Sequence, residues 1–237
     1  MFNPISSCLV FDTETTDLMP QFHGLLSNIP NDQLEKFPHI IQFSSISYSL
    51  ETQNVETFAD VIIKIPEHVE VTVENTNIHG ITKGMTQGKG VCIETTIENF
   101  MIEYMKTDLL VGHNISFDKK IVCIEIIRIV RSKNDETERE KWWGYYHLIM
   151  KKSKNSYCTM SNNTTLCNLF YVNSKGKSCK KPPKLIELFL FLFPQQQPTH
   201  LHNSLYDCFI TLKCYIKVTQ KYDLSEENEK TICDGFQ

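Results

Sequence analysis

Three short stretches of the chain carry side chains that could hold metal ions and transfer a proton. Asp12 and Glu14 follow an apolar run, Asp118 ends the sequence His-Asn-Ile-Ser-Phe-Asp, and His202 precedes Asp207 by five residues. Four carboxylates and one imidazole can hold two divalent cations with a proton acceptor beside them. Mg²⁺ and Mn²⁺ prefer carboxylate oxygens and water, and no Cys or His spacing in the chain indicates zinc. The three stretches therefore predict metal-assisted chemistry.

The first carboxylate pair lies at the end of residues 8–11, which have the length and the side chains of a buried strand. Residues two apart in an extended chain project from the same face of a sheet, so Asp12 and Glu14 share a face. Two unpaired carboxylates in such a place would cost several kcal/mol, which a bound cation would offset. For this segment alone, the alternative is a strand end capped by two solvated acids.

Asp118 is expected near a junction between a strand and a helix. The apolar run 109–112 predicts a strand, and the mostly apolar residues 121–127 predict a helix. Functional sites in open α/β sheets collect at the carboxyl ends of strands, where the first carboxylate pair is also expected. The alternative role for Asp118 is that of an acid favoured by the dipole at a helix N-terminus.

His202 and Asp207 would not share a face of one continuous helix, because five residues span about 140° beyond a full turn. They converge if His202 lies in the loop before the helix, with Asn203 or Ser204 as N-cap and Asp207 in the first turns. This spacing alone is very common, and a structural role is its default interpretation. The buried stripe of the helix is expected at Leu205, Phe209, Leu212 and Ile216.

The set of motifs, in this order, resembles the DEDDh group of DnaQ-like 3′→5′ exonucleases. The similar segments are 10–16, 78–82, 113–118, 184–188 and 202–207. The resemblance implies an α/β fold, the ribonuclease-H-like mixed five-stranded sheet flanked by helices. The β-branched and aromatic residues of 40–48 and 57–63 agree, because they predict an antiparallel meander. Residues 96–105 have apolar positions at helical spacing before the strand at 109–112.

The same resemblance implies that Asp12, Glu14, Asp118 and Asp207 hold two Mg²⁺ ions, with Mn²⁺ as a substitute, and that His202 accepts the proton of the attacking water. The expected reaction releases nucleoside 5′-monophosphates from single-stranded 3′ ends, with DNA favoured over RNA, in proofreading, repair or turnover. The alternatives are a 3′→5′ exoribonuclease or oligoribonuclease, and a non-catalytic nucleic-acid-binding module on the same fold. A polymerase or repair partner and a homodimer are expected by family analogy alone.

The substrate contacts are also implied by resemblance. Asp17 stands where the family has glycine, and it adds a side chain and a negative charge where backbone normally approaches the nucleotide. Either the loop is displaced or the substrate is handled differently. His79 could equally be a histidine of a loop or of the core, with its ring nitrogens hydrogen-bonded within the protein. The implied contacts are Thr13, Thr15, Leu18, Glu74, His79 and Asn114.

The exonuclease domain is expected over 1–222, followed by an acidic C-terminal tail at 223–237, with an insertion at 131–157. The aromatic residues of that insertion, beside Lys151, Lys152 and Lys154, could stack on bases, but anchoring to the core is the favoured interpretation. The segment 173–184 carries five lysines, and it is either a loop that contacts phosphates or a solvated loop.

Composition limits the number of domains, the class of protein and the cellular compartment. The chain has 237 residues, 41% of them hydrophobic, which fits one domain and leaves little room for a polymerase or helicase. A net charge of −4 excludes a polycation that coats nucleic acid. Nine cysteines without a Cys-x-x-Cys pair, no visible secretion signal and no long apolar run favour a cytoplasmic or nuclear protein that is not secreted. The scarcity of arginine, with abundant Asn and Ile, hints at an AT-rich genome such as some large DNA viruses or protists have.

Overall fold

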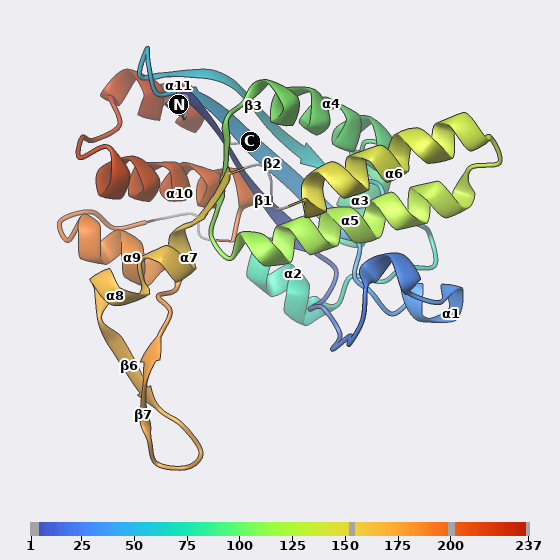
Figure 1. The fold of residues 1–237 in the computed structure, drawn as a ribbon, viewed down its shortest axis with the longest axis horizontal. Helices are drawn as coiled ribbons and strands as arrows, with labels where there is room; N and C mark the ends of the chain where they lie inside the picture. Colours follow the sequence, from blue (N-terminus) through green and yellow to red (C-terminus); the bar gives the residue numbers. More distant parts are fainter. Residues whose placement is uncertain (1–4, 152–154, 199–201, 236–237) are drawn as a thin grey trace.

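The computed structural model describes residues 5–151, 155–198 and 202–235, and a five-stranded mixed sheet lies at its centre (Figure 1). The strand order is β3-β2-β1-β4-β5. β1 pairs antiparallel with β2 and β2 with β3, whereas β1–β4 and β4–β5 are parallel. The predicted α/β fold class and its antiparallel meander are thereby confirmed. The strands are β1 (Ser7–Thr15), β2 (Ile40–Ser49), β3 (Asn54–Ile62), β4 (Leu109–Gly112) and β5 (Asn155–Cys158).

Helices cover both faces of the sheet (Figure 1). The alternation of β1 explains how the faces differ: Leu9 and Phe11 pack in one core, and Cys8 and Val10 pack in the other. Asp12 and Glu14 continue the second series, so they project toward the layer that contains α10. The first core is built with α4 (Ile93–Lys106), α5 (Ile115–Ser132) and α6 (Glu136–Met150), and the second with α9 (Leu185–Leu192), α10 (Ser204–Thr219) and α11 (Glu226–Cys233).

Shorter elements connect these layers. α2 and α3 each begin at a threonine, Thr72 and Thr82, whose side chain caps the helix. β6 and β7 pair antiparallel and form a hairpin that extends away from the body of the molecule (Figure 1). The elements are η1 (Leu26–Asn28), α1 (Asn31–Leu34), α2 (Val73–His79), α3 (Lys83–Gly88), α7 (Thr159–Asn162), α8 (Thr164–Cys167), β6 (Leu169–Val172) and β7 (Ser178–Lys181).

The segment 131–157, expected as an insertion, consists of the end of α5, then α6 and most of β5. Trp142, Tyr146 and Ile149 are buried at helical spacing against the first core, so the two aromatic residues, with Ile149, anchor α6. The last residues of the segment pair with β4 and complete the sheet. Part of the segment therefore belongs to the central sheet rather than to an addition. Lys152 and Lys154 lie outside the described residues.

The segment 223–237, expected as an acidic tail, differs from that expectation over its described part. It carries α11, capped by Ser225, and Ile232 of this helix is fully buried. Asn228 ties α11 to β3, because its Oδ1 accepts the Val55 N–H at 2.8 Å and its Nδ2 donates to the Gln53 carbonyl at 2.8 Å. The signal in the sequence was weak, because Ile232 is the only aliphatic residue of this otherwise mostly polar and acidic helix.

The sequence predicts reduced cysteines and no membrane-spanning helix. All nine cysteines are free thiols, and five of them are buried. In the described ranges, no helix has the length and hydropathy that a membrane span needs.

Candidate active site

Four carboxylates from three elements meet at the carboxyl end of β1. Asp12 and Glu14 come from β1, Asp118 from the first turn of α5, and Asp207 from the first turn of α10. One ligand atom each of Glu14, Asp207 and His202 lies within 4.8 Å of the other two. Asp12 lies close enough to Asp118, Asp207 and Glu14 for their charges to raise its pKa. The five residues predicted to form the site are therefore brought together.

The electrostatics of this cluster favour a bound cation. Burial, together with the neighbouring carboxylates, raises the pKa of Glu14 to about 8 and that of Asp12 well above its ordinary value. Burial raises the pKa values of Asp118 and Asp207 to about 7. In the described part of the chain, Asp207 Oδ1 is buried without a hydrogen-bond partner. Carboxylates that repel one another, with an unpartnered oxygen among them, fit divalent cations with oxygen ligands.

Thr13 fixes the orientation of Asp118. Its N–H and its hydroxyl both donate to Asp118 Oδ1, at 3.2 and 2.8 Å, and these bonds lower the pKa of Asp118 against the effect of burial. Because residues alternate along a strand, Thr13 projects from the face opposite to Asp12 and Glu14, toward α5. The Thr13 side chain is buried and contacts a carboxylate, whereas the substrate contact predicted for this residue is one of its backbone.

The start of α10 places Asp207 and His202. Asn203 is the N-cap, and its side chain accepts the Tyr206 N–H at 3.1 Å, which confirms the predicted cap. His202 lies in the turn before the helix with φ of 66°, an uncommon conformation that histidine tolerates better than most residues. This turn brings His202 back toward Asp207, and the His202 backbone donates a hydrogen bond to the Asp207 carboxylate.

A buried polar ladder joins β2 to the first residue of α10. Ser204 donates its N–H to Gln42 Oε1 at 3.3 Å, and its hydroxyl is hydrogen-bonded to the Ser44 hydroxyl. Gln42 and Ser44 in turn donate to Asp60 Oδ1 on β3, at 2.8 and 2.6 Å. The ladder holds α10 at a fixed position along the sheet.

The ladder was missed in the sequence, because its members are separated by long stretches of chain. In the sheet register, Ser44 pairs with Asp12 and Gln42 pairs with Glu14, so the ladder lies beside the carboxylates. The available signal was the alternation of polar Gln42 and Ser44 with apolar Ile41 and Phe43, which would place the two polar side chains on the same side as the acids.

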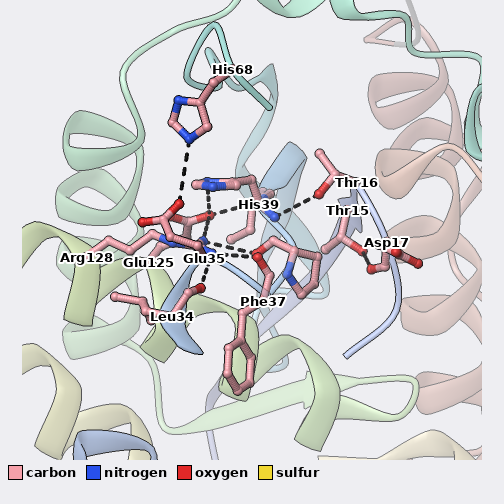
Figure 2. A network of polar contacts seen from close by, with 12 residues as sticks. Thr15, Thr16, Asp17, Leu34, Glu35, Phe37, His39, His68, Glu125 and Arg128 are labelled. Carbon is pink, nitrogen blue, oxygen red and sulfur yellow. Dashed lines mark hydrogen bonds and ion pairs between the residues drawn. The ribbon is translucent and has the colours of Figure 1, made fainter. Parts of the chain in front are cut away.

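A second network holds the chain that follows β1 (Figure 2). Thr16 exchanges hydrogen bonds with His39: its N–H donates to the His39 carbonyl at 2.9 Å, and its hydroxyl accepts the His39 N–H at 3.0 Å. Glu125 of α5 lies 3.4 Å from His39 Nδ1 and accepts from Arg128 at 3.0 Å. The network connects α5 to the segment that ends at β2, and so it fixes the position of β1 just beyond Glu14.

His79 presents a donor without a partner. Its Nδ1 accepts the Ile81 N–H at 3.0 Å, so Nε2 carries the proton, and this buried atom has no hydrogen-bond partner among the described residues. Burial, together with nearby His202, lowers the pKa of His79. The α2 helix is tied to the end of β1 because Asn75 donates to the Thr16 carbonyl. Glu74, on the same helix, is exposed.

The remaining predicted substrate residues lie around the end of β1. Leu18 is 80% exposed, and its N–H donates to the Asp17 carboxylate at 2.7 Å. Thr15 donates its hydroxyl to the Asp17 carbonyl at 2.7 Å. In the described part of the chain, positive φ occurs at two glycines and five other residues, and Asp17 is not one of them. The position therefore accepts a side chain without backbone strain. Asn114, with φ of 63°, forms the tight turn between β4 and α5.

A groove begins beside this turn. It has a volume of about 630 Å³ and runs between the segment 19–26 and the first turns of α5. Asn114, Phe117, Lys120 and Tyr146 line it. The groove is open and mixed in chemistry, with aromatic walls and one lysine.

The sequence matches the model of a known protein family. The exonuclease family model RNase T matches residues 9–215. No curated protein matches the chain.

Solved structures share the fold at low sequence identity. The zinc-bound complex of Escherichia coli exonuclease I with single-stranded DNA superposes with a TM-score of 0.60 at 16% identity, covering 91% of this chain and 41% of that chain. The complex of the same enzyme with a dA16 oligonucleotide gives 0.57 at 14%, covering 97% and 42%. Exonuclease I of Methylocaldum szegediense gives 0.56 at 16%, covering 91% and 41%. The chain thus spans about two fifths of the length of these structures.

Proposed function

The chain belongs to the RNase T exonuclease family, whose members are DnaQ-like with a ribonuclease-H-like fold, and we propose that it is a metal-dependent 3′→5′ exonuclease acting on single-stranded ends. The observation that carries the proposal is the convergence of four carboxylates with raised pKa values beside His202. The exonuclease I complexes with single-stranded oligonucleotides support DNA as the favoured substrate. The domain proposed over 1–222 contains every residue of this cluster.

In this proposal Asp12, Glu14, Asp118 and Asp207 hold two Mg²⁺ ions, with Mn²⁺ as a substitute. When bound, the ions neutralise charge on the phosphodiester and make water at the site more acidic. His202 accepts the proton of the attacking water, because histidine is suited to proton transfer near neutral pH and this side chain is exposed next to Asp207. A nucleoside 5′-monophosphate leaves the 3′ end.

The substrate contacts follow from the groups that the site leaves available. His79 Nε2–H can donate to the terminal sugar, since it is otherwise unpartnered among the described residues. Leu18 is free to pack against the terminal base because most of its surface is exposed. The backbone of Thr13 to Leu18, with Glu74 and Asn114 on either side, completes the proposed nucleotide site. A polymerase or repair partner and a homodimer stay predictions by analogy.

The test is digestion of 5′-labelled single-stranded DNA and RNA of one sequence, with Mg²⁺, with Mn²⁺ and with chelator. We expect a metal-dependent ladder that shortens from the 3′ end and is faster on DNA. Asp12→Asn should slow it by about a hundredfold or more, because charge stabilisation supplies much of such catalysis. The matched control is Asp32→Asn, an exposed acid of α1, which should leave the rate unchanged.

The other outcomes distinguish the alternatives. A faster ladder on RNA would assign the chain to exoribonucleases. Folded wild-type protein that binds both oligonucleotides and degrades neither would overturn the exonuclease and favour the non-catalytic binding module.

A further inference from the structure

The β6–β7 hairpin carries exposed apolar side chains that serve no core. Phe170 is 54% exposed, Tyr171 49% and Val172 70%. Phe170 pairs with Lys180 across the hairpin, and directly opposed residues of an antiparallel pair share a face. A lysine therefore lies beside an exposed aromatic ring. A two-stranded hairpin of this kind gains little from packing, so these side chains need another explanation than stability.

The hairpin is the centre of a strongly basic part of an acidic chain. Residues 141–186 contain nine lysines and no aspartate or glutamate, although the whole chain has a net charge of −4. Lys181 pairs with Glu187. No acidic side chain of the described residues pairs with Lys175, Lys177 or Lys180, and all three are exposed. The unpaired positive charge is complementary to a polyanion.

The base of the hairpin is attached to the edge of the sheet where the carboxylates lie. His113, which follows β4 directly, donates a hydrogen bond to the carbonyl of Pro183, two residues beyond β7. Nδ1 of His113 is hydrogen-bonded to the Thr159 hydroxyl at 2.9 Å. Because Asn114 and Asp118 follow His113 along the chain, the hairpin starts next to the candidate active site.

We propose that the β6–β7 hairpin is a second contact site for single-stranded nucleic acid, at which Lys175, Lys177 and Lys180 bind phosphates and Phe170 and Tyr171, on opposite faces of the hairpin, stack on bases. The inference rests on the proposed exonuclease function, since it assigns the path of the strand upstream of the site. Aromatic rings beside lysines are the combination that binds single strands without sequence preference. An acidic protein would satisfy the lysines but would leave the two exposed rings unexplained.

The experiment measures binding apart from cleavage. Fluorescence anisotropy with a 5′-labelled oligo(dT) of about 20 nucleotides, in chelator, gives Kd for wild type, for Lys175→Glu/Lys177→Glu/Lys180→Glu, and for Phe170→Ala/Tyr171→Ala. We expect Kd to rise about tenfold or more in each variant. The slope of log K against log[salt] should become less steep by about 2 in the lysine variant, because each of the three lost phosphate contacts contributes about 0.7 to the slope. The rate on a trinucleotide with Mg²⁺ should stay at the wild-type value.

The matched control is Lys89→Glu/Lys221→Glu/Lys230→Glu, which makes the same change of charge at exposed lysines outside the hairpin. Unchanged binding by both hairpin variants would overturn the inference and leave an acidic protein as the partner of the lysines. An equal loss in the control would also overturn it, because net charge alone would then explain the effect. Binding lost only in the hairpin variants of a protein that degrades nothing would keep the hairpin and overturn the exonuclease.

Discussion

At the scale of residues, the buried carboxylates of the site repel one another, and a bound cation would offset this repulsion. Asp118 and Asp207 have pKa values of about 7 and Glu14 of about 8, against ordinary values of 3.8 and 4.5. Each acid therefore binds its proton more tightly in the folded protein than in the unfolded chain. The stability that these protonated acids contribute is fully present below their ordinary pKa values, and it is lost as the pH rises through their raised pKa values.

The raised pKa values predict how the stability of the protein depends on pH and on metal. In chelator, the melting temperature should fall between about pH 5 and about pH 8, and Asp207→Asn should reduce the fall because it removes one titrating group. Mg²⁺ or Mn²⁺ at about 100 times its Kd should restore about 2.7 kcal/mol at the higher pH. Thermal melting followed by circular dichroism measures both effects. A melting temperature that ignores both pH and metal would contradict the predicted cation site.

Thr13 offers a second prediction at this scale. Thr13→Val removes the hydroxyl that donates to Asp118 at 2.8 Å while it keeps the shape of the side chain. We expect the Mg²⁺ concentration at half-maximal activity to rise about 10- to 100-fold, because residues that orient ligands tune metal affinity. Thr13→Ser keeps the hydroxyl and should behave as wild type. Equal losses in both variants would show that packing, and not the hydrogen bond, matters here.

At the scale of elements, a buried ion pair within α5, formed by Glu125 and Arg128, is the centre of a network that joins α5 to the loop before β2 (Figure 2). Burial alone would raise the pKa of Glu125, but Arg128, His39 and the Ile40 N–H bring it below its ordinary value. Arg128 also donates to the carbonyls of Leu34 and Phe37, at 3.1 and 2.6 Å. The two elements that position the end of β1 are therefore connected through one arginine.

Replacing that arginine should be costly. Arg128→Met leaves Glu125 buried without its arginine partner, and we expect a loss of about 3–5 kcal/mol in the free energy of unfolding. Adding Glu125→Gln should recover part of the loss, since the uncompensated charge is then absent. Arg139→Met breaks an exposed pair with Glu136 and should cost less than about 1 kcal/mol. Urea denaturation measures all three variants, and similar costs at both arginines would refute the argument from burial.

At the scale of the whole molecule, α11 closes the second core. Lys213 of α10 is only 4% exposed, and its ammonium group lies 2.6 Å from Glu229 of α11 and over the rings of Phe189, Phe193 and Phe209. Without α11, this charge would lose its carboxylate partner. The proposed domain of 1–222 is therefore completed by the segment that follows it.

Ile232 tests this dependence. Ile232→Ala removes a fully buried side chain and should lower the free energy of unfolding by about 2–5 kcal/mol. The control is Ile102→Ala on α4, where 46% of the side chain is exposed and the cost should be much smaller. Truncation after Tyr222 should cost more than Ile232→Ala, because it also unpairs Lys213. A truncated protein with wild-type stability in urea would restore the interpretation of this segment as a free tail.

The sequence by itself determined the strands and helices that carry the carboxylates. The apolar runs at β1 and β4 and the helical stripe of α10 are local patterns, so the strand ends and the Asn203 cap were predictable from neighbouring residues. The convergence of the carboxylates followed from their places at strand and helix ends together with the family resemblance.

Only the tertiary structure decided how those side chains are held. Ser44 and Ser204 are 160 positions apart, and Thr13 and Asp118 are 105 positions apart, so each contact depends on sheet register and helix packing. The docking of α11 depends on the same long-range packing, because Asn228 and Val55 are 173 positions apart. A local pattern fixes which face of an element is apolar, but the free energy that selects its partner comes from burial against residues far along the chain.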